Sequence, residues 1–184
     1  MNIKPLAISL ALLGCVAIHA PAATADAATE PNICAGTLQT GALRDIEAIC
    51  QHGRDWITAF KAGDIDALMA LYMPDAQVAL HGQHKLRGKD AIRAFFAPAL
   101  AARPKVEFLL HVEEIRVEGD LGYLVSRYWY TSQTPEGKLL QDAGRSLLIY
   151  RRARTQHGKP VWKIQFDIDQ ASPDVSFPAP ASAR

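Results

Sequence analysis

Residues 106–131 read VEFLLHVEEIRVEGDLGYLVSRYWYT, and this stretch decides the fold class. Its first half alternates apolar residues with others, at Val106, Phe108, Leu110 and Val112. That period of two is typical of a β-strand with one buried face. The alternation slips before it resumes at Ile115, as a β-bulge near Glu113 and Glu114 requires. Gly119-Asp120 then predicts a tight turn into a second strand.

Two more strands come after this hairpin. One is predicted from about 143 to 152, and the last runs through Trp162, Ile164, Phe166 and Ile168. Turn residues separate them, at Pro135-Glu136-Gly137 and at Gln156-His157-Gly158. Four successive strands joined by short turns predict an antiparallel meander.

Upstream of the strands, apolar residues recur at steps of three and four, which is the period of a helix with one buried face. The first helix is predicted from about 42 to 61, with Gly63 placed to end it. Asp64 can accept a hydrogen bond from the free amides of a second helix. Tyr72 lies on the predicted buried face of this helix, and Pro74 stops it.

A short strand at 76–81 and a third helix from Gly88 to about 101 complete the first half. Three helices followed by a meander predict one α+β domain over 42–171, in which the helices cover one face of a curved sheet. The tail at 172–184 contains three prolines among small residues and is expected to be loose.

The N-terminus has the pattern of a secretion signal over 1–25. Lys4 precedes an apolar stretch, and small residues come next that permit cleavage after Ala25 or Ala27. Cleavage predicts a periplasmic or secreted protein with no membrane span, beginning with a leader segment over 26–41. A retained anchor is a weaker alternative because the apolar run is short for a membrane-spanning helix. A lipoprotein acylated at Cys15 is a weaker alternative because apolar sequence continues beyond that cysteine.

Two cysteines, Cys34 and Cys50, remain after cleavage. In an oxidising compartment a disulfide between them would tie the leader to the first helix. Alternatively, Cys50 is a small buried apolar residue on the helix stripe.

The composition excludes several function classes. The net charge is +1, and the basic group Arg151, Arg152 and Arg154 lies at a strand end, so no nucleic-acid role is predicted. No His or Cys pair has zinc-ligand spacing, and no glycine-rich phosphate loop is present, so neither a metal nor another cofactor is expected.

Several short motifs together resemble the NTF2-like superfamily, especially its SnoaL-like and DUF4440 branches. They are Trp56-x-x-Ala59-x-x-x-Gly63-Asp64, Leu71-Tyr72-x-x-Asp75-Ala76, Gly88-x-x-Ala91-Ile92, Glu118-Gly119-Asp120 and Trp162-Lys163-Ile164. The resemblance implies a cone, in which a strongly curved antiparallel sheet wraps a helix around an apolar pocket. It also implies that two cones pair through their sheets as a homodimer.

The resemblance also gives a negative test. Ketosteroid isomerases of this superfamily use a helix tyrosine and a strand aspartate, and these positions fall on Trp56 and Leu80. Neither residue can do that chemistry. Steroid isomerisation is therefore not expected unless His81, the next residue, acts as the base.

Three polar residues are the candidate catalytic groups. His81 ends the short strand and is either a base or a surface histidine in a turn. Tyr128 shares a strand face with small residues and is placed inside, so Arg127 points outward. Asp167 is either half of a structural ion pair with Arg145 or orients a ligand together with it.

The other candidate ligand-binding residues are mainly aromatic. Trp56, Tyr72 and Phe95 are interpreted as pocket walls, although residues at this spacing are also typical of an ordinary core. His111 lies either in the pocket or on a sheet face buried by a partner subunit. That outer face carries Tyr123, Val125, Arg127 and Trp129 and favours a homodimer.

Three functions remain open from the sequence. The first is a cofactor-free acid/base enzyme of the isomerase, cyclase or dehydratase type that acts on a small apolar molecule. Alternatively, the chain is a small-ligand-binding protein of the cell envelope without turnover, or a structural dimer module whose own side chains fill the cavity.

Overall fold

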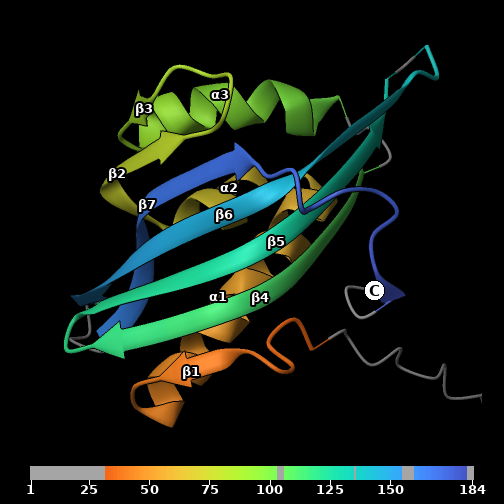
Figure 1. Cartoon of the computed structure of the whole chain (residues 1–184). Coiled ribbons are helices and arrows are strands. Elements are labelled where there is room, and N and C mark those ends of the chain that lie inside the picture. The colour runs from red at the N-terminus through yellow and green to blue at the C-terminus, as the bar shows by residue number, and fades with distance from the viewer. Residues whose placement is uncertain (1–31, 103–105, 135, 155–159, 182–184) are drawn as a thin grey trace, which may run out of the picture. The chain divides into compact units, whose positions relative to one another are not determined.

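The computed structural model describes residues 32–102, 106–134, 136–154 and 160–181. These residues form three helices and a seven-stranded sheet of order β1-β4-β5-β6-β7-β2-β3 (Figure 1). The predicted signal segment, 1–25, lies outside the described residues. No helix among those described is long and apolar enough to cross a membrane.

The predicted meander is confirmed. Each strand pairs antiparallel with the next, in the order β4 (Val106–Glu118), β5 (Leu121–Gln133), β6 (Leu139–Arg154) and β7 (Pro160–Ala171). The predicted bulge is confirmed as well. Val112 pairs with Ser126 and Glu114 pairs with Val125, so Glu113 is the extra residue.

The sheet is mixed rather than wholly antiparallel. β2 (Tyr72–Ala79) runs parallel to β7, and β1 (Leu38–Thr40) runs parallel to β4. A two-residue strand, β3 (Leu86–Arg87), pairs antiparallel with β2. The prediction missed β1 and β3 because such short segments carry too little alternation to be recognised.

The three helices lie near their predicted positions. α1 spans Leu43–Ala62, and Gly63 ends it with a left-handed φ of 71°. Asp64 accepts a hydrogen bond from the Ala67 amide at the start of α2 (Ile65–Ala70). α3 spans Lys89–Ala101.

The prediction for Tyr72 was wrong. This residue begins β2, opposite Ile164, rather than continuing the second helix. The residue before a proline disfavours helical backbone, so the segment leading to Pro74 is extended, and the proline lies within the strand. Tyr72 consequently belongs to the sheet layer and can contact β7.

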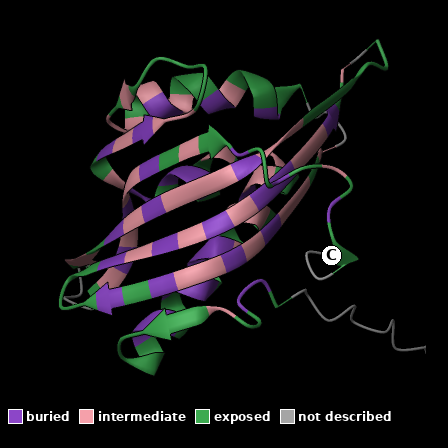
Figure 2. Cartoon of the chain, in the orientation of Figure 1, coloured by how far each residue is buried: buried purple, intermediate pink, exposed green. Residues whose placement is uncertain are grey.

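The helices cover one face of the curved sheet. Figure 2 shows that buried residues alternate with less buried ones along the long strands. The core between the sheet and the helices includes Ile49, Leu68, Ile92, Ile115, Leu124 and Ile164, all of which are fully buried. We call this side of the sheet the inner face and the opposite side the outer face.

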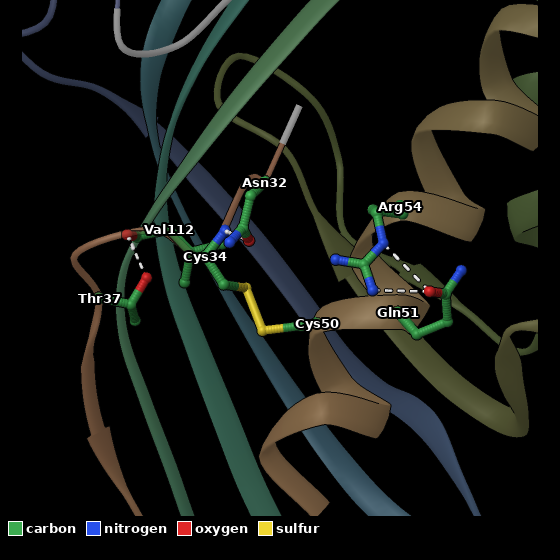
Figure 3. Close-up of a disulfide and its surroundings, with 7 residues drawn as sticks. All are labelled: Asn32, Cys34, Thr37, Cys50, Gln51, Arg54 and Val112. Atoms are coloured by element: carbon green, nitrogen blue, oxygen red, sulfur yellow. Dashed lines mark hydrogen bonds between the residues drawn. A yellow bond between two sulfur atoms is a disulfide. The ribbon is translucent and has the colours of Figure 1, made fainter. Parts of the chain in front are cut away.

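A disulfide fastens the segment before α1 to the domain. It joins Cys34 to Cys50 in α1, which decides between the two alternatives for Cys50 (Figure 3). Hydrogen bonds to β4 also attach this segment. The Val112 amide of β4 donates to the Ile33 carbonyl at 2.9 Å. The Thr37 hydroxyl donates to the Val112 carbonyl at the same distance.

The C-terminal segment is not loose as predicted where it is described. Val175 and Ala179 are buried against Trp129, and the Trp129 indole donates to the Ser176 carbonyl at 2.9 Å. The tail therefore covers one of the aromatic residues that the sequence interpretation left exposed on the outer face.

Candidate functional site

The inner face of the sheet borders a cavity of about 430 Å³. Side chains from α1, α3 and the four long strands line it, together with residues of the loop after β2. Its walls are mostly aromatic. Trp56 stacks on Phe60 with ring centroids 4.9 Å apart, and Phe108 stacks on Tyr128 at 6.1 Å.

Asp167 of β7 contributes a buried carboxyl group to this cavity. The Tyr72 hydroxyl donates to its Oδ2 atom at 2.8 Å and accepts a hydrogen bond from the Trp56 indole at 2.9 Å. Burial raises the pKa of Asp167 to about 7, although the hydrogen bond from Tyr72 opposes that shift. The group therefore exchanges protons near neutral pH.

A second irregularity in the sheet turns Asp167 inward. Ile149 pairs with Phe166 whereas Tyr150 pairs with Ile164, so Gln165 is an extra residue in β7. Beyond this bulge the side chains change face. Asp167 and the next alternate residue, Asp169, line the cavity, and Ile168 is exposed.

A second polar cluster contains His81, Asp142 and Asp169. The His81 backbone amide donates to Asp169 Oδ1 at 2.6 Å, and the His81 ring Nδ1 lies 3.2 Å from the same oxygen. Its Nε2 lies 3.5 Å from Asp142 Oδ1. One ligand atom from each residue lies within 4.8 Å of the others, so the three side chains could together hold a cation.

Tyr128 connects this cluster to the aromatic wall. Its hydroxyl donates to Asp142 Oδ2 at 3.2 Å, while its ring stacks on Phe108. Burial, together with the nearby carboxylates of Asp169 and Asp142, raises the pKa of Tyr128 well above its ordinary value. The hydroxyl consequently keeps its proton and remains a hydrogen-bond donor.

The structure brings most of the predicted site residues together. His81, Tyr128 and Asp167 all line this cavity, and Trp56 and Phe95 form part of its walls. Tyr72 is not in the wall. Its hydroxyl donates a hydrogen bond to Asp167, so any contribution of Tyr72 to catalysis would act through that carboxyl group.

Two of the candidate ligand-binding residues, Arg145 and His111, do not face the cavity. Arg145 lies on the outer face, where it binds Glu113 at 2.8 Å and Asp174 at 2.7 Å, so it forms no pair with Asp167. His111 is opposite Arg127 in the β4–β5 pairing. Residues directly opposite in a sheet share a face, so His111 also lies on the outer face and not in the cavity.

The sequence interpretation missed Asp142 and Asp169. A signal was present for the second one, because Asp167 and Asp169 are alternate residues in an otherwise apolar strand and so share a face. Nothing in the local sequence of Asp142 links it to His81, which lies 61 positions earlier in the chain.

Comparison with known proteins agrees with this architecture. Residues 53–159 match the family model of the SnoaL-like domain, which is more than half of the chain. No curated protein sequence matches.

Three solved structures share the fold. One is a proposed dehydratase of the NTF2-like family from Streptomyces avermitilis, with 19% identity, TM-score 0.61, and 71% of this chain and 97% of that chain covered. Another is a ketosteroid isomerase-like protein from Erwinia carotovora atroseptica, with 20% identity, TM-score 0.60, and coverage of 72% and 100%. The third is a proposed aromatic ring hydroxylase from Novosphingobium aromaticivorans, with 22% identity, TM-score 0.61, and coverage of 74% and 95%. At these identities the likeness shows the fold alone.

Proposed function

We propose that this chain, which belongs to the SnoaL-like domain family, is a cofactor-free acid/base enzyme that acts on a small apolar molecule. One observation carries the proposal: the carboxyl group of Asp167 is buried in an aromatic cavity and has a pKa of about 7. A general base is most effective when its pKa lies near the working pH. Isomerisation, cyclisation and dehydration all need such a proton transfer.

The residues around the cavity take separate roles in this proposal. Ionised Asp167 removes a proton from the ligand, and Tyr72 orients the carboxyl group through its hydrogen bond to Oδ2. Tyr128, by turning its hydroxyl from Asp142 to the ligand, and His81 are the candidate donors to a ligand oxygen on which negative charge develops. The aromatic walls exclude water from the reacting atoms.

A proton-abstraction probe tests this proposal without knowledge of the natural substrate. In 5-nitrobenzisoxazole, a flat aromatic molecule, removal of the ring C–H proton by a base breaks the N–O bond and gives a coloured cyanophenolate. The rate should rise with pH around a midpoint near 7, because only the carboxylate form of Asp167 accepts the proton.

The variant Asp167→Asn should lower this rate at least about a hundredfold, which is the usual contribution of a positioned base. Glu47→Gln is the matched control, since it removes one carboxylate from an exposed position of α1 outside the cavity. An unchanged rate in Asp167→Asn would overturn the proposal. Ligand binding without any turnover would favour the alternative, a binding protein of the cell envelope.

We also propose that the protein is exported to the periplasm or the exterior. The apolar N-terminal segment supports this, and so does the disulfide between Cys34 and Cys50. Disulfides form and persist in oxidising compartments, whereas cytosolic thiols are kept reduced.

A homodimer through the outer face completes the proposal. Two cross-strand rows of β5, β6 and β7 place exposed or partly exposed apolar side chains next to each other there: Tyr123, Ile149 and Phe166 in one row, and Val125, Leu147 and Ile168 in the other. An apolar patch of this kind on a soluble domain is typical of an interface. Trp129 is not available to it, because the tail covers that residue.

A further inference from the structure

The charged side chains of the cavity have one sign. Asp142, Asp167 and Asp169 line it, and none of the described residues that line it is Lys or Arg. A cavity with low-dielectric walls and charges of one sign concentrates ligands of the opposite sign. Among the described lining residues His81 alone could carry a positive charge, and both of its ring nitrogens already face carboxylates, Nδ1 that of Asp169 and Nε2 that of Asp142.

The aromatic walls favour the same kind of ligand. Trp56, Phe60, Phe108 and Tyr130 form one cluster, with ring centroids from 4.9 to 6.3 Å apart. The faces of such rings carry partial negative charge and attract cations, and the attraction grows when water is excluded. The aromatic rings and the carboxylates therefore both favour a cationic ligand.

The carboxylates lie where a small cationic group would fit. Metal-ligand atoms of His81, Asp142 and Asp169 lie within 4.8 Å of one another, and Tyr128 joins this cluster to the rings, because its hydroxyl donates to Asp142 and its ring stacks on Phe108. An ammonium group placed there would have several acceptors in reach, while the apolar remainder of the molecule would contact the aromatic wall.

We propose that the ligand of this cavity is an organic cation, an apolar molecule with one ammonium group, whose charge binds at Asp142 and Asp169. This inference rests on the proposed function only in placing the ligand in the same cavity, and it names the substrate class. Binding of the cation does not require turnover, so the two proposals can fail separately.

The test compares three probes of similar size by isothermal titration calorimetry on the intact protein. Benzyltrimethylammonium carries a permanent charge, neopentylbenzene is its neutral isostere, and phenylacetate is an anionic aromatic. The cation should bind at least about tenfold more tightly than its isostere, as expected for a partly buried charge next to carboxylates and rings. Phenylacetate should bind most weakly.

Protein variants locate the charge. Asp142→Asn and Asp169→Asn should each weaken binding of the cation about fivefold to tenfold and leave the neutral isostere unchanged. Glu47→Gln should change neither affinity, because that exposed glutamate is not part of the lining. Binding of the isostere also reports whether each variant still forms the cavity.

Three outcomes would overturn the inference. The first is equal affinity for the cation and its isostere, and the second is an unchanged cation affinity in both Asp→Asn variants. The third is stoichiometric Zn²⁺ or Mn²⁺ binding that excludes the organic cation, which would make the cluster a metal centre. Loss of benzisoxazole turnover in Asp167→Asn together with no cation preference would leave the acid/base proposal standing and remove only this inference.

Discussion

Asp167 provides a stability test of the site that needs no ligand. Its folded-state pKa of about 7 lies above the ordinary value of 3.8 because burial disfavours the charged form. The folded protein therefore holds this proton more tightly than the unfolded chain. The contribution to stability is fully present below pH 3.8 and is lost as the pH rises towards and through 7.

The size of the effect is set by these two pKa values. At about 1.4 kcal/mol for each pH unit between 3.8 and about 7, ionisation of Asp167 costs the folded state about 4 kcal/mol at pH 8. Asp167→Asn keeps an acceptor for the Tyr72 hydroxyl and cannot ionise. We expect the variant to be more stable than the parent protein at pH 8 by up to about 4 kcal/mol, or about 10 °C in Tm.

Urea unfolding of both proteins at pH 4, 6 and 8 measures this difference. Other groups also titrate, such as His52, whose pKa burial lowers to about 4, so the quantity of interest is the difference between the variant and the parent. The advantage of the variant should be small at pH 4 and grow with pH. A constant difference would show that Asp167 does not titrate in this range. A variant less stable at every pH would show that the carboxyl group is structural.

Four further predictions concern other parts of the molecule. Reducing the disulfide, whose cysteines are 16 positions apart, should lower the free energy of unfolding by about 3 kcal/mol in the loop-entropy account, measured by urea unfolding with and without dithiothreitol. Sedimentation at micromolar concentration should give twice the mass of one chain, and Leu147→Glu should give a monomer, since it places a charge within the outer apolar patch. Deletion of the residues after Ala171 should expose Trp129 and shift its fluorescence to longer wavelength; an unchanged spectrum would contradict the packing of the tail. Mass spectrometry of the exported protein should show cleavage after residue 25 or 27, and a full-length product would contradict export.

The fold class could be predicted because its signals are local. Alternation and turn residues predict the four long strands, and the slip after Val112 predicts the bulge at Glu113. Tyr128 could be assigned to the inner face because Gly122 and Ser126 share its side of the strand. The boundary between the second helix and β2 was harder to predict, since Tyr72 continues a helical spacing while pairing in the structure makes it a strand residue.

The partners of the candidate site could not be predicted in the same way. His81, Asp142 and Asp169 come from a loop and two strands that are distant in sequence. Their approach depends on the parallel pairing of β2 with β7, which places the end of β2 beside the end of β7. Local patterns determine which residues form a strand, but they do not determine which strands become neighbours.

The supposed pair of Arg145 with Asp167 shows how register decides a site. Towards the end of β6, Arg151 lies opposite Lys163. If that register continued, Arg145 would lie opposite Asp169 and on the same face as Asp167. Both sequence-based alternatives for Asp167, an ion pair with Arg145 and a ligand site shared with it, need the two side chains on one face, and a shift of one residue removes both.

That shift is the bulge at Gln165. Because of this one extra residue, Arg145 lies opposite Gln170 on the outer face, while Asp167 faces the cavity. The apolar residues Ile164 and Phe166 keep their spacing of two across the bulge, so the hydrophobic pattern gives no sign of it, unlike the slip at Glu113. The placement of Asp167 and Asp169 in the cavity lining therefore results from backbone register, and a change that removed the bulge without deleting a residue would turn the carboxyl group of Asp167 out of the site.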